Sequence, residues 1–453
     1  MTGRAWGIVG LGVLLLLAGG AFWIRGESAP PVLAFPDAGR DVFVGSAGAT
    51  FEVRVADAGS GLRTASIRLR HADGDAVLAE KSFPGNALTG GAIGEETLEA
   101  AIDAASLGLA TGDAVLVAEA TDWSWAGFFA GNSATLEVPI TIDLEAPRVS
   151  VASGLTYVKR AGSGAVRYRV FEETADDGVR VGDAVFHGHP VPGSGAGEGE
   201  RVALFAVARD AAQDVRPVVF ARDRAGNERQ VRWPVHVQQR TFSRIPIRLG
   251  RAFMEGKVPS LAAELGIAGD DAVRIFQTIN RDERARNEET IRGIAARSAD
   301  APLFEGAFVQ MRNSAVTSRF AEHRTYFVGG KEVSEAIHYG YDLASVAGAP
   351  IEAANAGTVV HAAPLGIYGN CVIVDHGLGL MSLYGHLREM DVKAGDRVAK
   401  GQRLGRSGAT GLAGGDHLHF AILVGSTYVD PKEWWDPRWV RDRIAPALAG
   451  ATP

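Results

Sequence analysis

Apolar and polar residues alternate over several short stretches after residue 30, a pattern that predicts β-strands with one face in a core. Residues 50–55 and 66–70 alternate in this way, and Gly, Asp and Ser residues between them mark a turn. Similar alternation returns at residues 166–170 and is followed by a turn at residues 176–179. We therefore expect two antiparallel β-sandwiches, at residues 31–145 and 146–240, built on one plan.

The two predicted sandwiches also share a phrase near their ends. Ala-Thr-Asp at residues 120–122 precedes Gly131-Asn132, and Ala-Arg-Asp at residues 221–223 precedes Gly226-Asn227. On these short phrases both modules resemble bacterial immunoglobulin-like domains. Residues 123–129 add an aromatic cluster, which either packs over an open sandwich end or binds a sugar or a partner protein.

From about residue 247 the apolar residues recur with the period of a helix. Ala272, Val273, Phe276 and Ile279 form one apolar stripe, and residues 281–297 alternate in charge. We interpret residues 241–302 as a helical linker, either a plain connector or an arm that shades the site described below. Its charged face predicts a docking that buries little apolar area and is easily reversed.

The N-terminus has a different pattern, because residues 6–24 form an uncharged run of 19 residues between Arg4 and Arg25. This length suits a bilayer span. A cleavable signal peptide is the alternative, with the small residues 18–21 as its cleavage region. Since the apolar run continues to residue 24, we expect residues 1–30 to be an uncleaved signal anchor. The remaining chain would then lie outside the cytoplasm, in the periplasm of a Gram-negative cell.

Composition narrows these expectations. The net charge of −7 argues against a nucleic acid as the main partner. The chain has a single cysteine, Cys371, so the exported domains have no internal disulfide and depend on their hydrophobic cores.

Side chains able to bind a metal concentrate near the C-terminus, in an H-x-G-x-D run from His338 to Asp342 and an H-x-H run from His417 to His419. An extended backbone would place His338, Gly340 and Asp342 on one strand face, with Gly340 leaving room above it. Nitrogen and carboxylate ligands without thiolate suit Zn²⁺, and three protein ligands with one open position are typical of a catalytic site. An L-Y-G-H-L run adds His386, so one histidine is spare for proton transfer.

These three runs come in order with V-I-V-D-H-G and V-x-x-G-Q-x-L-G-x-S-G-x-T-G between them. Over about residues 303–436 the set closely resembles the lysostaphin/LytM-type zinc metallopeptidases, which cut peptidoglycan peptides. The resemblance implies a half-open antiparallel β domain at residues 303–440, with a tail at 441–453. It also implies that His338, Asp342 and His419 bind one zinc ion, while His386 and His417 act as general base and as oxyanion or leaving-group partner.

The pattern predicts a mainly β, multidomain, membrane-anchored protein, and the resemblance implies that it is a zinc metalloendopeptidase of the cell wall. Its expected partners are peptidoglycan peptides, the cytoplasmic membrane and an unidentified regulator. By the resemblance, the bond between D-alanine and diaminopimelate is the expected target. The alternative is a non-enzymatic LytM-like adaptor that activates another wall hydrolase. Such adaptors typically lack part of the zinc set, which is complete here.

Overall fold

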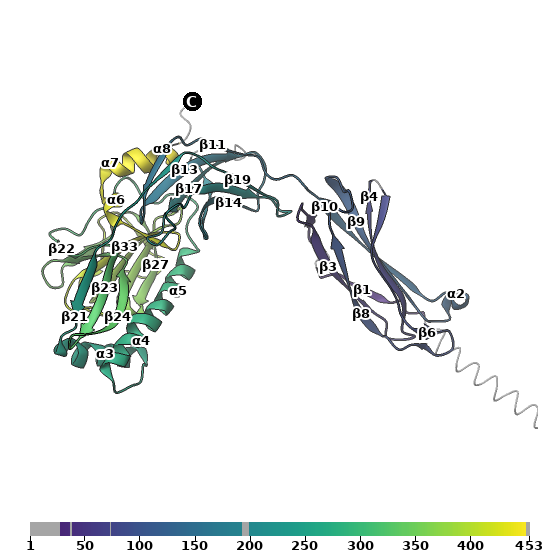
Figure 1. The fold of residues 1–453 in the computed structure, drawn as a ribbon, viewed down its shortest axis with the longest axis horizontal. Helices are drawn as coiled ribbons and strands as arrows, with labels where there is room; N and C mark the ends of the chain where they lie inside the picture. Colours follow the sequence, from purple (N-terminus) through teal and green to yellow (C-terminus); the bar gives the residue numbers. More distant parts are fainter. Residues whose placement is uncertain (1–27, 37–38, 73, 193–198, 450–453) are drawn as a thin grey trace, which may run out of the picture. The chain divides into compact units, whose positions relative to one another are not determined.

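The computed structural model describes residues 28–36, 39–72, 74–192 and 199–449 (Figure 1). The chain is mainly β and multidomain, as the sequence predicts, and it divides into two compact units. The first comprises residues 1–146 and 222–228, and the second residues 147–221 and 229–453. The predicted anchor at residues 6–24 lies outside the described residues. None of the helices in the described part has the length and apolar character that a bilayer crossing requires.

The first unit is a sandwich of two sheets around one core. Burial alternates along its strands: Phe51, Val53 and Val55 are buried, and Glu52 and Arg54 between them are exposed. The first sheet has the order β1 (Val32–Ala34), β3 (Ala49–Ala56), β8 (Glu95–Ile102). The second has the order β2 (Val42–Val44), β10 (Ser133–Ile142), β9 (Gly112–Asp122), β4 (Leu62–His71), β5 (Gly74–Ser82).

The aromatic cluster at residues 123–129 divides between packing and exposure. The indole of Trp125 donates a hydrogen bond to the carbonyl oxygen of Ala87, in the loop of the small β6–β7 ladder (Gly85–Asn86 and Gly90–Gly91). Phe128, in the short turn α2 (Ala126–Phe129), is 98% exposed. Packing therefore accounts for Trp125, whereas the side chain of Phe128 is left exposed to solvent.

The second unit begins with another sandwich. One sheet has the order β11 (Val149–Val151), β13 (Ser163–Val170), β17 (Glu200–Ala206), β16 (His189–Pro190). The other has the order β15 (Ala184–His187), β14 (Asp176–Val181), β18 (Val218–Arg222), β19 (Glu228–Val231). In addition, β12 (Thr156–Lys159) pairs in parallel with β20 (Val235–Gln238), as β2 pairs in parallel with β10 in the first unit.

This second sandwich shares a core with the C-terminal domain. The fully buried Trp434 donates its indole N–H to Ser163 Oγ at 3.0 Å, and Arg240 Nη1 lies 2.6 Å from Asp430 Oδ2. The chain ends in α6 (Pro431–Trp435), α7 (Pro437–Trp439), η4 (Val440–Ile444) and α8 (Ala445–Leu448). The predicted tail is thus helical as far as residue 448.

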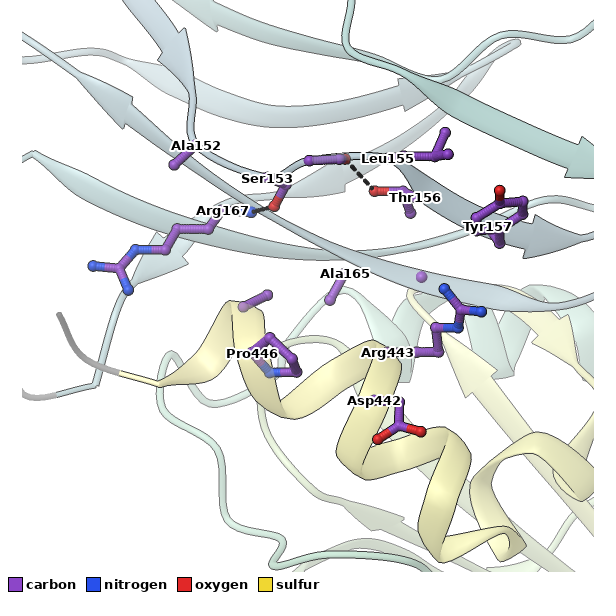
Figure 2. Close-up of a pocket in the computed structure, with 13 residues that line it drawn as sticks. Ala152, Ser153, Leu155, Thr156, Tyr157, Ala165, Arg167, Asp442, Arg443 and Pro446 are labelled. Carbon is purple, nitrogen blue, oxygen red and sulfur yellow. Dashed lines mark hydrogen bonds between the residues drawn. The ribbon is translucent and has the colours of Figure 1, made fainter. Parts of the chain in front are cut away.

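The last helices pack against the sandwich beside a pocket of about 290 Å³ (Figure 2). Arg167 Nη1 donates to the carbonyl oxygen of Ala449 at 2.5 Å, and the Arg443 guanidinium lies 5.1 Å from the centre of the Tyr157 ring. These contacts hold the C-terminal segment on the sandwich.

The C-terminal domain is built on an eight-stranded antiparallel sheet. Its order is β22 (Ala315–Ser318), β25 (Tyr341–Ala344), β33 (Leu418–Val424), β29 (Leu380–Leu387), β28 (Asn370–Asp375), β27 (Gly357–Pro364), β31 (Arg397–Val398), with β34 (Thr427–Val429) beside β33. Every residue of β29 and β33 is buried, which explains their nearly continuous apolar sequence. Two three-stranded sheets complete the domain: β26 (Pro350–Glu352), β32 (Arg403–Arg406), β30 (Glu389–Met390), and β21 (Arg244–Arg248), β23 (Glu322–Val328), β24 (Lys331–His338).

The segment predicted as a linker is helical but is an integral part of this domain. Its helices are η1 (Phe253–Lys257), α3 (Val258–Leu265), α4 (Ala272–Thr278), η2 (Ile279–Glu283) and α5 (Arg284–Ala295). Asp271 caps α4 by accepting from the backbone N–H groups of Val273 and Arg274, as its acidic start predicts.

The expected weak docking of this segment is wrong. Phe276 and Ile279 are 0% exposed and Ile291 is 2% exposed, and all three belong to the core of the C-terminal domain. Ahead of the helices, β21 pairs in parallel with β23 and so adds a strand to a sheet. The charge pattern of residues 281–297 describes only the outer face of α5, whose inner face buries Asn287, Ile291 and Ala295.

Replacing Phe276 with alanine is expected to destabilise the C-terminal domain by about 3–5 kcal/mol, because the ring fills the core. It packs 5.2 Å, centroid to centroid, from the ring of Tyr326. Urea unfolding of the full chain measures this change. Arg274→Ala, in the same helix with a side chain 86% exposed, is the control and should unfold like the wild type. A Phe276→Ala protein as stable as this control would mean that the segment is a loosely held arm after all.

Candidate active site

The chain passes from one sheet to another within the H-x-G-x-D run. β24 ends at His338 and β25 begins at Tyr341, so residues 339 and 340 form the corner. The expectation that His338, Gly340 and Asp342 share one face of one strand is therefore wrong. The side chains of His338 and Asp342 converge because the corner redirects the chain. Asp342 also lies opposite His419 in the β25–β33 pairing, which brings the third side chain to the same place.

The three predicted metal ligands lie together, and all are buried. Their ligand atoms fall within 4.8 Å of one another. His338 Nε2 lies 2.9 Å from Asp342 Oδ1 and 3.1 Å from His419 Nδ1. His419 Nδ1 lies 3.1 Å from the same Oδ1, so the three atoms form a tight triangle.

The protonation of His338, His419 and Asp342 decides whether these three residues can hold a cation. His338 Nδ1 is 2.9 Å from the carbonyl oxygen of Arg319, which only accepts, so Nδ1 is the donor there and Nε2 is the nitrogen that faces the other two ligand atoms. Burial lowers the pKa of His419 to about 4, so this ring is neutral at pH 7. Burial alone would raise the pKa of Asp342, but the facing imidazoles hold it well below the usual range.

The three facing atoms are two imidazole nitrogens and one carboxylate oxygen, and each can offer a lone pair to a cation once it carries no proton. His419 Nε2, on the far side of the ring from the other two ligand atoms, is buried without a hydrogen-bond partner. A divalent cation held by two imidazole nitrogens and one carboxylate oxygen would use all three lone pairs. The residues present therefore fit a metal ion.

Gly340 makes room for one of these ligands. A Cβ atom at this position would lie 2.6 Å from both Cε1 and Nε2 of His419 and 2.7 Å from the carbonyl oxygen of Phe420. The sequence suggests open space above Gly340, and the structure identifies the group that fills it as the His419 ring.

Arg324 is a site residue that the sequence analysis misses. It comes from β23, and its Nη2 lies 3.0 Å from Asp342 Oδ2. This ion pair holds Oδ2 away from the imidazoles and leaves Oδ1 to face them. No motif marks Arg324, because its partner follows 18 residues later in a different sheet. The one available signal is that Arg324, a charged residue, lies two positions before the buried Tyr326 and so on the same side of the strand.

His386 and His417 lie beside the triangle, with ring centroids 4.8 Å apart. His386 donates from Nδ1 to the carbonyl oxygen of Thr410 at 2.9 Å, which leaves Nε2 with a lone pair. Burial first, and then the neighbouring His417 and His419, lower the pKa of His386 well below its usual value. The ring is therefore neutral at pH 7 and able to accept a proton. It is held in a left-handed backbone conformation, with φ 64°, that only a constrained environment maintains.

The pKa of His417 is shifted in the opposite direction to that of His386. Its Nδ1 donates to the carbonyl oxygen of Gly415 at 2.8 Å, and its Nε2 lies 3.5 Å from Asp342 Oδ1. Burial opposes protonation, but the facing carboxylate raises the pKa of His417 above its usual value. The two imidazoles thus supply one proton acceptor and one proton donor at the same site.

A cleft of about 400 Å³ contains all five predicted site residues. Its walls are mainly apolar and come from both the helical segment and the loop before β33: Ile247, Leu249, Phe253, Phe276, Leu412 and Ala413. The other H-x-H pair, His187 and His189, forms no such centre, since the two rings pair with separate carboxylates, Asp176 and Asp300.

Comparison with known proteins agrees with this geometry. Residues 336–431 match the model of Peptidase family M23. These residues form a peptidase family M23 domain. The domain contains His338, Asp342, His386, His417 and His419, whereas Arg324 and the helical segment precede it. The resemblance seen in the sequence is thereby confirmed.

Two relatives from Vibrio cholerae serotype O1 are similar over this region. The peptidoglycan DD-endopeptidase ShyA is 40% identical over 87 residues, which cover 19% of this chain and 20% of ShyA. The peptidoglycan DD-endopeptidase ShyB is 36% identical over 115 residues, covering 25% of this chain and 26% of ShyB. The chain therefore matches about a fifth to a quarter of the length of these relatives.

Solved structures are also similar in part. A peptidase M23 crystal structure from Pseudomonas aeruginosa is 22% identical and covers 61% of this chain and 94% of its own, with a TM-score of 0.40. The catalytic domain of lysostaphin from Staphylococcus simulans is 31% identical and covers 29% of this chain and 98% of its own, with a TM-score of 0.25.

Gly340→Ala is expected to lower metal affinity roughly 10- to 100-fold, the range found when groups that orient metal ligands are changed. The added methyl group would displace the His419 ring. Competition with a chelator, followed by metal analysis, measures the affinity. Gly293→Ala is the control, because a Cβ there meets nothing within 4 Å, and it should bind metal normally. Unchanged affinity in Gly340→Ala would show that His419 does not need its present position to hold the ion.

Proposed function

We propose that this protein is a zinc metalloendopeptidase that hydrolyses the peptide cross-links of peptidoglycan. The observation that carries the proposal is the complete site in one cleft of the M23 domain: three converging ligand atoms and two further imidazoles of opposite proton affinity. The names of the relatives, which are peptidoglycan DD-endopeptidases, support the choice of substrate.

Zinc is the proposed ion, because two imidazoles and one carboxylate without a thiolate are typical ligands of catalytic zinc sites. When bound, zinc supplies Lewis-acid polarisation of the peptide carbonyl and acidifies a water molecule. His338 Nε2, Asp342 Oδ1 and His419 Nδ1 would hold it, since these are the atoms that face one another. Arg324 keeps the second oxygen of Asp342 engaged and so fixes the direction of Oδ1.

The two other imidazoles carry the proton movements. His386, neutral and with its lone pair at Nε2, takes the proton of the attacking water. His417, whose Nε2 bears the second proton when the ring is charged, stabilises the negative charge that develops on the carbonyl oxygen or donates to the leaving nitrogen. Removal of one such donor from an enzyme costs about 2.7–4 kcal/mol in the transition state.

We also propose where the protein lies in the cell. An anchor formed by residues 6–24 would hold the enzyme on the outer face of the cytoplasmic membrane, with all described domains in the periplasm. The two sandwiches, whose described residues hold no second group of metal ligands, would then act as spacers between the membrane and the wall.

Metal binding and catalysis should separate by residue. Asp342→Ala and His419→Ala are expected to lose zinc and activity together. His417→Ala should keep about one zinc per chain and still lose roughly 100- to 1000-fold in hydrolysis of purified peptidoglycan. Metal analysis and release of soluble fragments measure the two properties. A wild-type chain that binds zinc but releases nothing, while activating another wall hydrolase, would instead be a non-enzymatic adaptor.

The proposed anchor predicts that the mature protein keeps residues 1–30 and sediments with the membranes. Cell fractionation followed by N-terminal sequencing checks this. Replacement of Leu15 and Leu16 by aspartate should prevent retention in the membrane, since charges at the centre of a span are costly. A soluble mature form that begins near residue 21 or 26 would instead indicate a cleaved signal peptide.

A further inference from the structure

The cleft carries more positive charge than its metal centre uses. The whole chain has a net charge of −7, yet the residues that line the cleft include three arginines, Arg248, Arg284 and Arg324, and a single carboxylate, Asp342. Arg324 is neutralised by its ion pairs with Asp342 and Glu322. The guanidinium groups of Arg248 and Arg284 therefore have no carboxylate partner among the residues that line the cleft.

Arg284 opens α5 at the cleft wall and is half-buried. Its Nε donates to the carbonyl oxygen of Asn280 at 3.2 Å, and its Nη2 donates to Asn280 Oδ1 at 2.8 Å. A guanidinium has five N–H groups, so three remain available to a ligand. Glu288, one helical turn further on, accepts a hydrogen bond from Tyr368 Oη at 2.9 Å, and it interacts with Arg284 through its charge but takes none of the N–H donors of Arg284.

Arg248 reaches the same cleft from the end of β21. It is exposed, and within the described residues its side chain makes no hydrogen bond or ion pair. Ile247, Leu249, Phe253 and Phe276 line the wall around the two arginines. An apolar wall that bears two guanidinium groups with N–H donors still available suits a peptide with a carboxylate, which arginine binds through paired N–H donors.

We propose that Arg248 and Arg284 bind a free carboxylate of the substrate next to the scissile bond, so that the cleft selects cross-links in which this carboxylate is unmodified. The proposal rests on the proposed endopeptidase function and specifies its substrate. In a cross-link from D-alanine to diaminopimelate, the carbon that bears the scissile nitrogen carries such a carboxylate. Conversion of this group to a carboxamide removes the charge and leaves the bond to be cut unchanged.

The test uses the full-length protein and two cross-linked peptides that differ only in this group, carboxylate or carboxamide. The wild type is expected to cleave the carboxylate form with a kcat/KM about tenfold higher, as the loss of a charge-assisted hydrogen bond implies. Arg284→Gln and Arg248→Gln should each reduce this preference severalfold, while cleavage of the carboxamide stays within about threefold of the wild type. Arg284→Lys, which keeps the charge, should retain part of the preference.

Arg274→Gln provides the matched control, because Arg274 lies in the same helical segment, is 86% exposed and does not line the cleft. It should keep the full preference. Equal cleavage of both peptides by the wild type would overturn the carboxylate subsite and leave the peptidase intact. An equal loss on both peptides in Arg284→Gln would assign this arginine to the support of α5 and also overturn the proposal. Failure to cleave either peptide or intact peptidoglycan would instead refute the endopeptidase function itself.

Discussion

The site is organised around one carboxylate, Asp342, whose two oxygens meet groups of opposite kind. Oδ2 is held by the Arg324 guanidinium, and Oδ1 faces the imidazole nitrogens of His338 and His419. A cation held by Oδ1 and these two nitrogens would offset the burial of the carboxylate charge. The corner at residues 339–340, the absent side chain of Gly340 and the pairing of Asp342 with His419 all serve to place that one oxygen.

The helical segment contributes both to the core of the domain and to the wall of the cleft. Phe276 fills the core and also lines the cleft, so this wall of the cleft is fixed by packing. A cleft built this way is largely preformed, which lowers the entropy lost when a peptide binds. It also means that the M23 domain depends on residues outside the region that defines its family, because β21 and the helices complete its sheets and core.

The five candidate site residues could be picked out from the sequence because each lies in a short run that resembles a motif of one family, and the structure brings all five into one cleft. The alternation in residues 50–55 likewise predicts the buried face of β3. Other features depend on contacts between distant segments. Arg324 meets Asp342 across two sheets, and the inner face of α5 is hidden by a strongly charged outer face. The sequence does not reveal the corner at Gly340, because a continuous strand and a corner between two sheets have the same local pattern of apolar and polar residues here.

The left-handed backbone of His386 separates what the backbone favours at this position from what the side chain supplies. A non-glycine residue with φ 64° stores strain, and glycine or asparagine would relax it. The imidazole in turn donates to the carbonyl oxygen of Thr410 and lies beside His417, contacts that neither replacement reproduces in full. A change to glycine would therefore ease the backbone and at the same time leave a void beside His417 and an unpaired carbonyl oxygen at Thr410.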